Sequence, residues 1–209
     1  LDRGGLVGED GVTHHGVFDM AAFGAVPGLT IAAPMNEPEL RNMMYTALGS
    51  GHPFMIRYPR GHGEGLPWRG EKFETLPVGR GRRLREGADV ALLTVGTVGN
   101  AAARAAGRAA AEGVSVAHYD LRFVKPLDEA LLDEVGRKFR RVVTVEDGSL
   151  RGGVGEAVAA FFNGRGYDVR VQRLGIGDEW VEHGTPGQLY ALCGYDEEGI
   201  LRALLDTRA

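Results

Sequence analysis

The second half of the chain alternates short apolar runs with longer amphipathic segments. Aliphatic and β-branched residues cluster in the runs, whereas apolar residues recur three and four positions apart in the segments between them. Strands are therefore expected at 90–95, 114–119, 141–145 and 169–174, and helices at 99–112, 127–139, 155–163, 186–192 and 197–205. Alternation of this kind gives βαβ units, so it predicts an α/β fold with a parallel sheet covered by helices on both faces.

The first 65 residues have a different, glycine-rich character. Residues 4–16 contain many glycines and no sustained apolar period, which predicts a long loop of the kind that is either functional or disordered. Two short apolar runs follow, at 29–33 and 53–58, each closed by a proline, as expected for strands. Between them, Asn36 is placed to cap the N-terminus of a helix.

A change of composition separates the two regions. Residues 61–77 combine glycines and prolines with charged residues and a lone Trp68, which is typical of a connecting segment. We therefore expect two domains, over residues 1–70 and 71–209. The chain opens on Leu1 without an initiator methionine or a signal peptide, and Arg3 stands where a strand would end, so a further segment is expected upstream.

Composition excludes several classes of function. The net charge of −4 and the pI of about 5.9 argue against a surface for nucleic acid or anionic membrane. No run reaches the roughly 18 apolar residues that a membrane span requires. A single cysteine, Cys193, precludes an internal disulfide and fits a reducing, cytoplasmic compartment, where it is expected to be a buried apolar residue.

Three arginines stand near expected strand ends, where ligands collect in parallel sheets. Arg3 follows the cut strand, and Arg57 and Arg60 flank Tyr58-Pro59 at the exit of the next one. Converging guanidinium groups capture phosphate or carboxylate, which makes a phosphate clamp one interpretation. The alternative is a set of surface arginines, because the chain has 24 basic residues.

The glycine-rich loop carries candidate acid–base groups. His14 and His15 follow Glu9-Asp10. A loop histidine can move protons or donate to a developing alkoxide, and Asp10 can orient a substrate or a histidine. Adjacent histidines with one nearby acid lack the usual zinc spacing, so a metal site is not expected. A polar surface loop without function is the alternative.

A second glycine-rich segment, residues 148–155, precedes an expected helix. A helix N-terminus attracts anions, but the segment has neither the dinucleotide fingerprint nor the lysine of a P-loop. Close packing of strand and helix explains its glycines better. Glu146 and Asp147 are expected to form an exposed acidic turn at the strand end.

Several long strings resemble one family in order along the chain. Asp2-Arg3-Gly-Gly-Leu-Val-Gly-Glu-Asp10-Gly-Val-Thr-His14 and Ile56-Arg-Tyr-Pro-Arg-Gly61 are similar to segments of the 1-deoxy-D-xylulose-5-phosphate synthases. These are transketolase-like enzymes that use thiamine diphosphate. Residues 33–48, 120–129, 145–155 and the Gly184-Thr185 turn resemble the same family. The resemblance covers essentially the whole chain. It implies the end of a pyrimidine-binding domain in residues 1–70 and a C-terminal transketolase-type domain, serving structure and dimerisation, in residues 71–209.

The resemblance also implies a reaction and a set of roles. Pyruvate would lose CO2 on thiamine diphosphate and condense with D-glyceraldehyde 3-phosphate, a first step toward isoprenoids that also serves thiamine biosynthesis. Arg3 and Arg60 would bind the acceptor phosphate with Arg57 in support, Asp10 would contact the acceptor, and His14 would assist proton transfer at its carbonyl. His15 is given no role.

The same resemblance indicates what this chain lacks. The ligands of Mg²⁺ and of the cofactor diphosphate, and the glutamate that activates the cofactor, are expected upstream of Leu1, in the missing N-terminal part of a homodimer. Two alternatives remain open from the residues. One is the β-subunit of a 2-oxo-acid dehydrogenase, although the arginines suit a phosphorylated acceptor better than a lipoyl arm. The other is a non-catalytic α/β dimerisation module.

Overall fold

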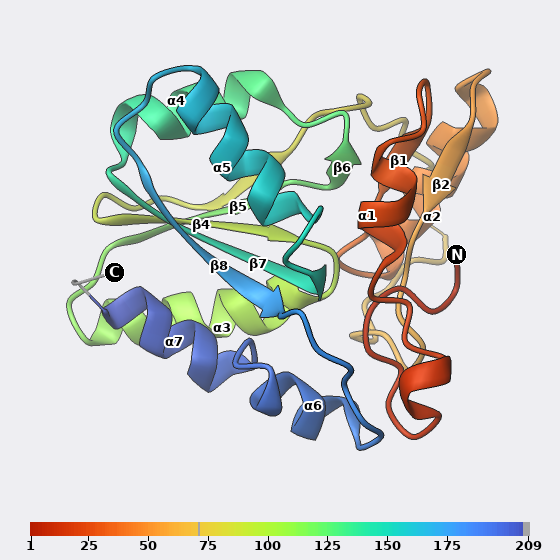
Figure 1. Ribbon diagram of the computed structural model, residues 1–209. Coiled ribbons are helices and arrows are strands. Elements are labelled where there is room, and N and C mark those ends of the chain that lie inside the picture. The colour runs from red at the N-terminus through yellow and green to blue at the C-terminus, as the bar shows by residue number, and fades with distance from the viewer. Residues whose placement is uncertain (71, 207–209) are drawn as a thin grey trace.

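Two sheets organise the part of the chain that the computed structural model describes, residues 1–70 and 72–206 (Figure 1). The larger sheet has the strand order β3-β5-β4-β7-β8. Its strands are β3 (Arg82–Arg85), β4 (Val90–Val95), β5 (Val116–Asp120), β7 (Arg141–Ser149) and β8 (Arg170–Ile176). Strands β5, β4, β7 and β8 run parallel, which confirms the predicted parallel sheet. Every residue of β4 is buried, as its apolar run requires at the centre of the sheet.

Helices cover both faces of this sheet (Figure 1). Helices α3 (Val98–Ala111) and α7 (Glu197–Leu205) pack on one face, and α4 (Glu129–Lys138) and α5 (Val154–Gly164) pack on the other. The buried face of α3 is made of alanines at helical spacing, which lets the helix lie close to the sheet. Helix α6 (Pro186–Leu192) begins with a capping box between Thr185 and Gln188.

Strand β3 departs from the predicted pattern. It joins the edge of the sheet antiparallel to β5. Its sequence, Arg-Arg-Leu-Arg, has no apolar run, because an edge strand exposes most of its side chains to solvent. The sequence pattern therefore missed it.

The smaller sheet has the order β2-β1-β6. Strand β1 (Thr30–Ala32) pairs in parallel with β2 (Phe54–Ile56) and antiparallel with β6 (Phe123–Lys125), which follows β5 in the chain. Strand β6, which lies beyond the connecting segment in the sequence, thus completes the smaller sheet. Helix α2 (Glu37–Gly49) joins β1 to β2, and the Asn36 side chain accepts a hydrogen bond from the Glu39 N–H at 3.1 Å, as predicted for its cap.

Two short helical segments flank the end of the glycine-rich loop. The 3-10 helix η1 (Gly11–Thr13) lies within it, and α1 (Asp19–Gly24) follows it. Neither is long enough to produce a helical apolar period, and neither was predicted. None of the helices in residues 1–70 and 72–206 combines the length and the apolar character needed to cross a membrane.

Candidate functional site

The glycine-rich loop begins and ends at the same place in the fold. Gly5 and Gly16 exchange backbone hydrogen bonds of 2.9 Å in both directions, so the two ends of the loop lie side by side. Leu6 and Val17, which flank this closure, are buried in the core beneath α3. Apolar anchors at both ends fix the loop, and between them Glu9, Asp10, Thr13 and His14 present polar groups at the surface.

Asp10 and Arg60 meet at the surface. The Arg60 guanidinium forms an ion pair with the Asp10 carboxylate, and the side chains are 49% and 36% exposed, respectively. Arg3 is also exposed, and the next residue, Gly4, donates its N–H to the Tyr58 carbonyl at 3.0 Å. Arg3 thus lies on the segment that runs beside the exit of β2. The fold brings Asp10 to Arg60 and places Arg3 on the neighbouring stretch of backbone.

The two histidines of the loop have different environments. His14 is exposed, and its Nδ1 lies 2.9 Å from the Thr13 hydroxyl. His15 accepts the Val7 N–H at Nδ1 (3.1 Å), while its Nε2 lies 3.4 Å from the Glu182 carbonyl oxygen. Because Nδ1 accepts, the ring proton lies on Nε2 and points at Glu182. His15 therefore holds the loop together, whereas the ring of His14 remains accessible to a ligand.

Arg57 lies beneath the loop. Its side chain is 4% exposed, and its Nε donates to the Asp19 carboxylate at 2.6 Å. Its Nη2 donates to the backbone carbonyls of Asp147 (2.9 Å) and Gly16 (3.4 Å). These bonds tie together β2, α1, the loop and β7, so any support that Arg57 gives to a phosphate is transmitted through the position of the loop.

The second glycine-rich segment forms no open anion site. The Glu146 carboxylate accepts the N–H groups of Val154 (2.7 Å) and Gly155 (2.8 Å), which occupies the N-terminus of α5 with a group of the protein itself. Burial raises the pKa of Glu146 to about 7. The predicted exposed acidic turn is wrong, because Glu146 and Asp147 are 1% and 4% exposed. Strand β7 continues through both residues into the interior, which the local sequence did not indicate.

A hollow of about 680 Å³ lies next to Arg60. Its wall includes Tyr58 and His62 from the first region, Asn100 and Arg104 from α3, and Tyr190 from α6. Arg104 in turn pairs with Glu197 at 2.8 Å. The hollow therefore lies between the two regions. Arg60, which is part of its wall, is in contact with Asp10.

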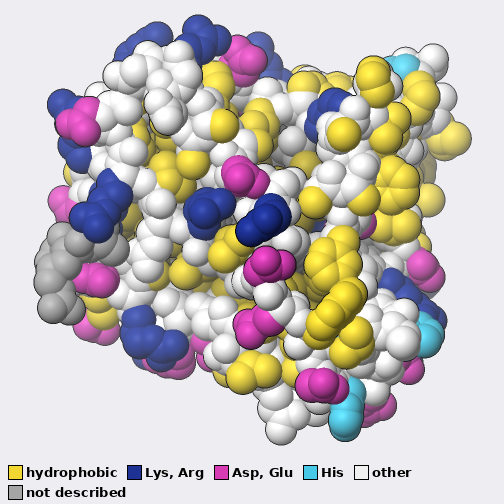
Figure 2. Space-filling view, in the orientation of Figure 1, with side chains coloured by type: hydrophobic (Ala, Val, Ile, Leu, Met, Phe, Trp, Pro, Cys, Tyr) yellow, Lys and Arg dark blue, Asp and Glu magenta, His cyan; other side chains and the backbone are white. Residues whose placement is uncertain are grey.

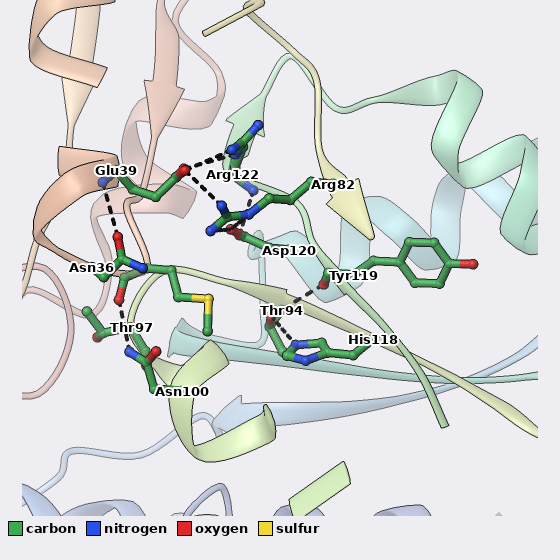
Figure 3. Close-up of polar contacts among 11 residues, drawn as sticks. Asn36, Glu39, Arg82, Thr94, Thr97, Asn100, His118, Tyr119, Asp120 and Arg122 are labelled. Carbon is green, nitrogen blue, oxygen red and sulfur yellow. Dashed lines mark hydrogen bonds and ion pairs between the residues drawn. The ribbon is translucent and has the colours of Figure 1, made fainter. Parts of the chain in front are cut away.

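An ionic network fixes the two regions on each other (Figure 3). Glu39 of α2 accepts both Nε (2.9 Å) and Nη2 (2.8 Å) of Arg122 and pairs with Arg82 at 3.0 Å. Arg82 also pairs with Asp120 at 3.1 Å. Burial raises the pKa of Asp120 to about 6. The charges of this network neutralise one another, so it has a structural role.

The surface differs between the two regions. Figure 2 shows hydrophobic side chains gathered over the part that contains α1 and the smaller sheet, where Phe18, Phe23 and Val26 are exposed. Charged side chains of both signs are spread over the remainder of that face. In the part of the chain that the structure describes, no three His, Cys, Asp or Glu side chains come together so as to hold a metal ion.

Comparison with known proteins places each region. The transketolase C-terminal domain matches residues 79–200, and the transketolase pyrimidine binding domain matches residues 1–64. Proteins named 1-deoxy-D-xylulose-5-phosphate synthase are similar along the whole chain. The one from Bacteroides fragilis is 56% identical over 210 residues, covering 100% of this chain and 32% of the relative. The one from Symbiobacterium thermophilum is 46% identical over 200 residues, covering 96% of this chain and 31% of the relative.

A solved structure shares the fold. It is described as "Split gene transketolase, inactive beta4 tetramer", with a TM-score of 0.80 and 28% sequence identity. The similarity covers 92% of this chain and 61% of that one. The chain spans about a third of the length of the curated relatives that it matches.

Proposed function

The chain belongs to the transketolase family, and from that membership we propose that it is the C-terminal part of a 1-deoxy-D-xylulose-5-phosphate synthase. The complete enzyme would condense pyruvate, with loss of CO2, with D-glyceraldehyde 3-phosphate. The observation that carries this proposal is the ion pair of Arg60 with Asp10, on the loop that also exposes His14, in a chain more than half identical to a synthase of that name.

We assign the two regions to two domains. Residues 1–70 would be the end of the pyrimidine-binding domain with its connecting segment, and residues 71–209 the C-terminal domain. The ranges of the two matching domains support this division. Because β6 pairs with β1, the domains would share a strand across their boundary.

Arg3 and Arg60 would bind the phosphate of the acceptor. Both are exposed, and Arg3 lies on the segment that runs beside the exit of β2, which Arg60 follows. Guanidinium groups match phosphate oxygens in charge and geometry. A dianionic phosphate would compete with Asp10 for Arg60. The carboxylate released from that ion pair would then accept a hydrogen bond from an acceptor hydroxyl.

His14 would act at the acceptor carbonyl. When the carbonyl carbon is attacked, its oxygen becomes an alkoxide that needs a proton or a hydrogen-bond donor. The exposed ring of His14, on the same loop as Asp10, can supply either one.

Thiamine diphosphate, when bound, supplies the electron sink for decarboxylation. The residues described here do not fit the carboxylate-rich site of its metal, because no three His, Cys, Asp or Glu side chains come together among residues 1–70 and 72–206. We propose that the ligands of Mg²⁺ and diphosphate belong to the part of the complete protein that the longer relatives contain. We also expect the complete protein to form a homodimer in the cytoplasm.

The test is CO2 release from pyruvate by the complete protein with thiamine diphosphate and Mg²⁺. D-Glyceraldehyde 3-phosphate should accelerate release strongly, whereas unphosphorylated D-glyceraldehyde, the matched control, should do so weakly because it lacks the group that Arg3 and Arg60 bind. Release that ignores both aldehydes but requires a lipoyl acceptor would instead assign the chain to the 2-oxo-acid dehydrogenases.

A further inference from the structure

A buried carboxylate at the end of β7 lies directly against the glycine-rich loop. The Asp147 side chain accepts the backbone N–H of Leu6 at 3.0 Å and the Tyr195 hydroxyl at 2.8 Å, both at Oδ1. Its Oδ2 accepts the Tyr190 hydroxyl at 3.3 Å. The donors come from the start of the loop and from the C-terminal helical segment, so one carboxylate joins the two regions.

This carboxylate is costly to bury. Asp147 is 4% exposed, and burial raises the pKa of its carboxyl group. A buried acid seldom adds stability over an apolar residue, but it can specify one arrangement among several because its bonds have fixed directions. The Leu6 N–H is the one donor to the Asp147 side chain here that belongs to the loop.

The loop is fitted closely around Asp147. Gly5 has φ +91°, and a Cβ atom on it would lie 1.9 Å from Asp147 Oδ2. Any side chain at that position would collide with the carboxylate, so glycine is required by both conformation and contact. Beyond this point the loop reaches Gly184, whose N–H lies 3.5 Å from the Gly8 carbonyl, and His15 reaches Glu182. The C-terminal domain therefore forms one wall of the loop.

We propose that Asp147 is a positioning residue for the acceptor site: by holding Leu6 it sets the place of Asp10 and His14, so the C-terminal domain takes part in building that site. The identity of the acceptor rests on the proposed function, whereas the contact with the loop does not. Asp147 itself touches no substrate in this scheme. It acts through the three residues that separate Leu6 from Asp10, the ion-pair partner of Arg60.

The first test compares Asp147→Ala with Asp147→Asn in the complete enzyme. Asparagine keeps an oxygen that can accept the Leu6 N–H, whereas alanine leaves that donor unsatisfied. The alanine variant should raise KM for D-glyceraldehyde 3-phosphate by about tenfold or more and change KM for pyruvate by less than about twofold. The asparagine variant should remain within about threefold of wild type for both substrates. Equal effects on the two substrates, or no effect of alanine, would overturn the proposal.

Glu146→Gln provides a matched control. Glu146 is the adjacent residue of the same strand and equally buried, but its carboxylate bonds to the start of α5 and not to the loop. It should leave the ratio of the two KM values unchanged. If Glu146→Gln changed that ratio as much as Asp147→Ala does, the effect would be a general disturbance of β7. That result would contradict a specific role for Asp147.

Hydrogen–deuterium exchange gives a readout that does not depend on the substrate. Asp147→Ala should speed exchange at the amides of residues 5–16 by about tenfold or more, with little change in α5. If that variant does not fold, Tyr195→Phe, which removes one donor to the same Oδ1 atom, should speed exchange in the same loop by about threefold. Unchanged exchange in the variant that folds would overturn the positioning role.

The two proposals can fail separately. A wild-type enzyme that ignores the aldehyde phosphate would refute the proposed function, yet exchange in the loop would still report on Asp147. A wild-type enzyme that requires the aldehyde phosphate, combined with unchanged exchange in Asp147→Ala, would refute the positioning role alone.

Discussion

Arg57 and Asp19 form a buried ion pair, with 2.6 Å between Nε and Oδ2 and side-chain exposures of 4% and 5%. Arg60, only three residues further along the chain, is 49% exposed and meets Asp10 at the surface. Both arginines follow the end of β2 at Ile56, and only Tyr58 and Pro59 separate them, yet the first is buried and the second is exposed. Their substitution should therefore affect different properties.

Arg57→Ala should destabilise the protein by about 3–5 kcal/mol, because it leaves the Asp19 carboxylate buried without its partner. Urea unfolding of the variant would measure the loss. Arg60→Ala is the matched control, and since its ion pair is solvent-exposed it should cost less than about 1 kcal/mol. Similar unfolding midpoints for the two variants would contradict the difference in environment.

Arg60→Ala should instead raise KM for the phosphorylated acceptor by about tenfold to a hundredfold, the worth of one charged hydrogen bond, with little change for pyruvate. Steady-state kinetics of the complete enzyme would measure both constants. With unphosphorylated D-glyceraldehyde as the acceptor, Arg60→Ala should no longer raise KM. Arg83→Ala, which removes an exposed arginine paired with Glu134 at the far edge of the larger sheet, should change neither constant.

His14→Ala should lower turnover by about a hundredfold to ten-thousandfold, the usual contribution of a general acid–base, while cofactor binding is kept. Turnover and the affinity for thiamine diphosphate would be measured on the same preparation. His52→Ala is a suitable control, since His52 bonds to Thr30 and lies outside the loop. A His14 variant that loses the cofactor but retains turnover at saturation would refute the assignment.

Glu146 should make stability depend on pH. Its pKa is raised from 4.5 to about 7, chiefly by burial. The folded state favours the protonated form, so this contribution is fully present below pH 4.5 and is lost as pH rises through 7. A shift of this size corresponds to roughly 3 kcal/mol. Glu146→Gln carries an uncharged side chain at both pH values, so its stability should not show this loss. The unfolding free energy of the variant, relative to that of wild type, should therefore rise by about that amount between pH 5 and pH 8. If the unfolding free energies of wild type and Glu146→Gln changed in parallel with pH, the predicted role of Glu146 would be contradicted.

Local sequence was sufficient for the elements whose signals lie within a few residues of one another. The apolar run of β4, the alanine face of α3 and the Asn36 cap were all predicted and are all present. The elements that were missed lack such signals: β3 is an arginine-rich edge strand, and β6, η1 and α1 are only three to six residues long. Their place is determined by the strands beside them.

The candidate site divides in the same way. Arginine near expected strand ends, and histidine with aspartate in a glycine-rich loop, predict groups that would bind phosphate and move protons, so the sequence by itself was enough to propose Arg3, Asp10, His14 and Arg60. Only the tertiary structure decided that Arg57 is buried, that Glu146 fills a helix terminus and that Asp147 holds the loop. The physical reason is distance along the chain. Leu6 and Asp147 are 141 residues apart, and the burial that gives their hydrogen bond its importance exists only after β7, the loop and the C-terminal helices have packed together.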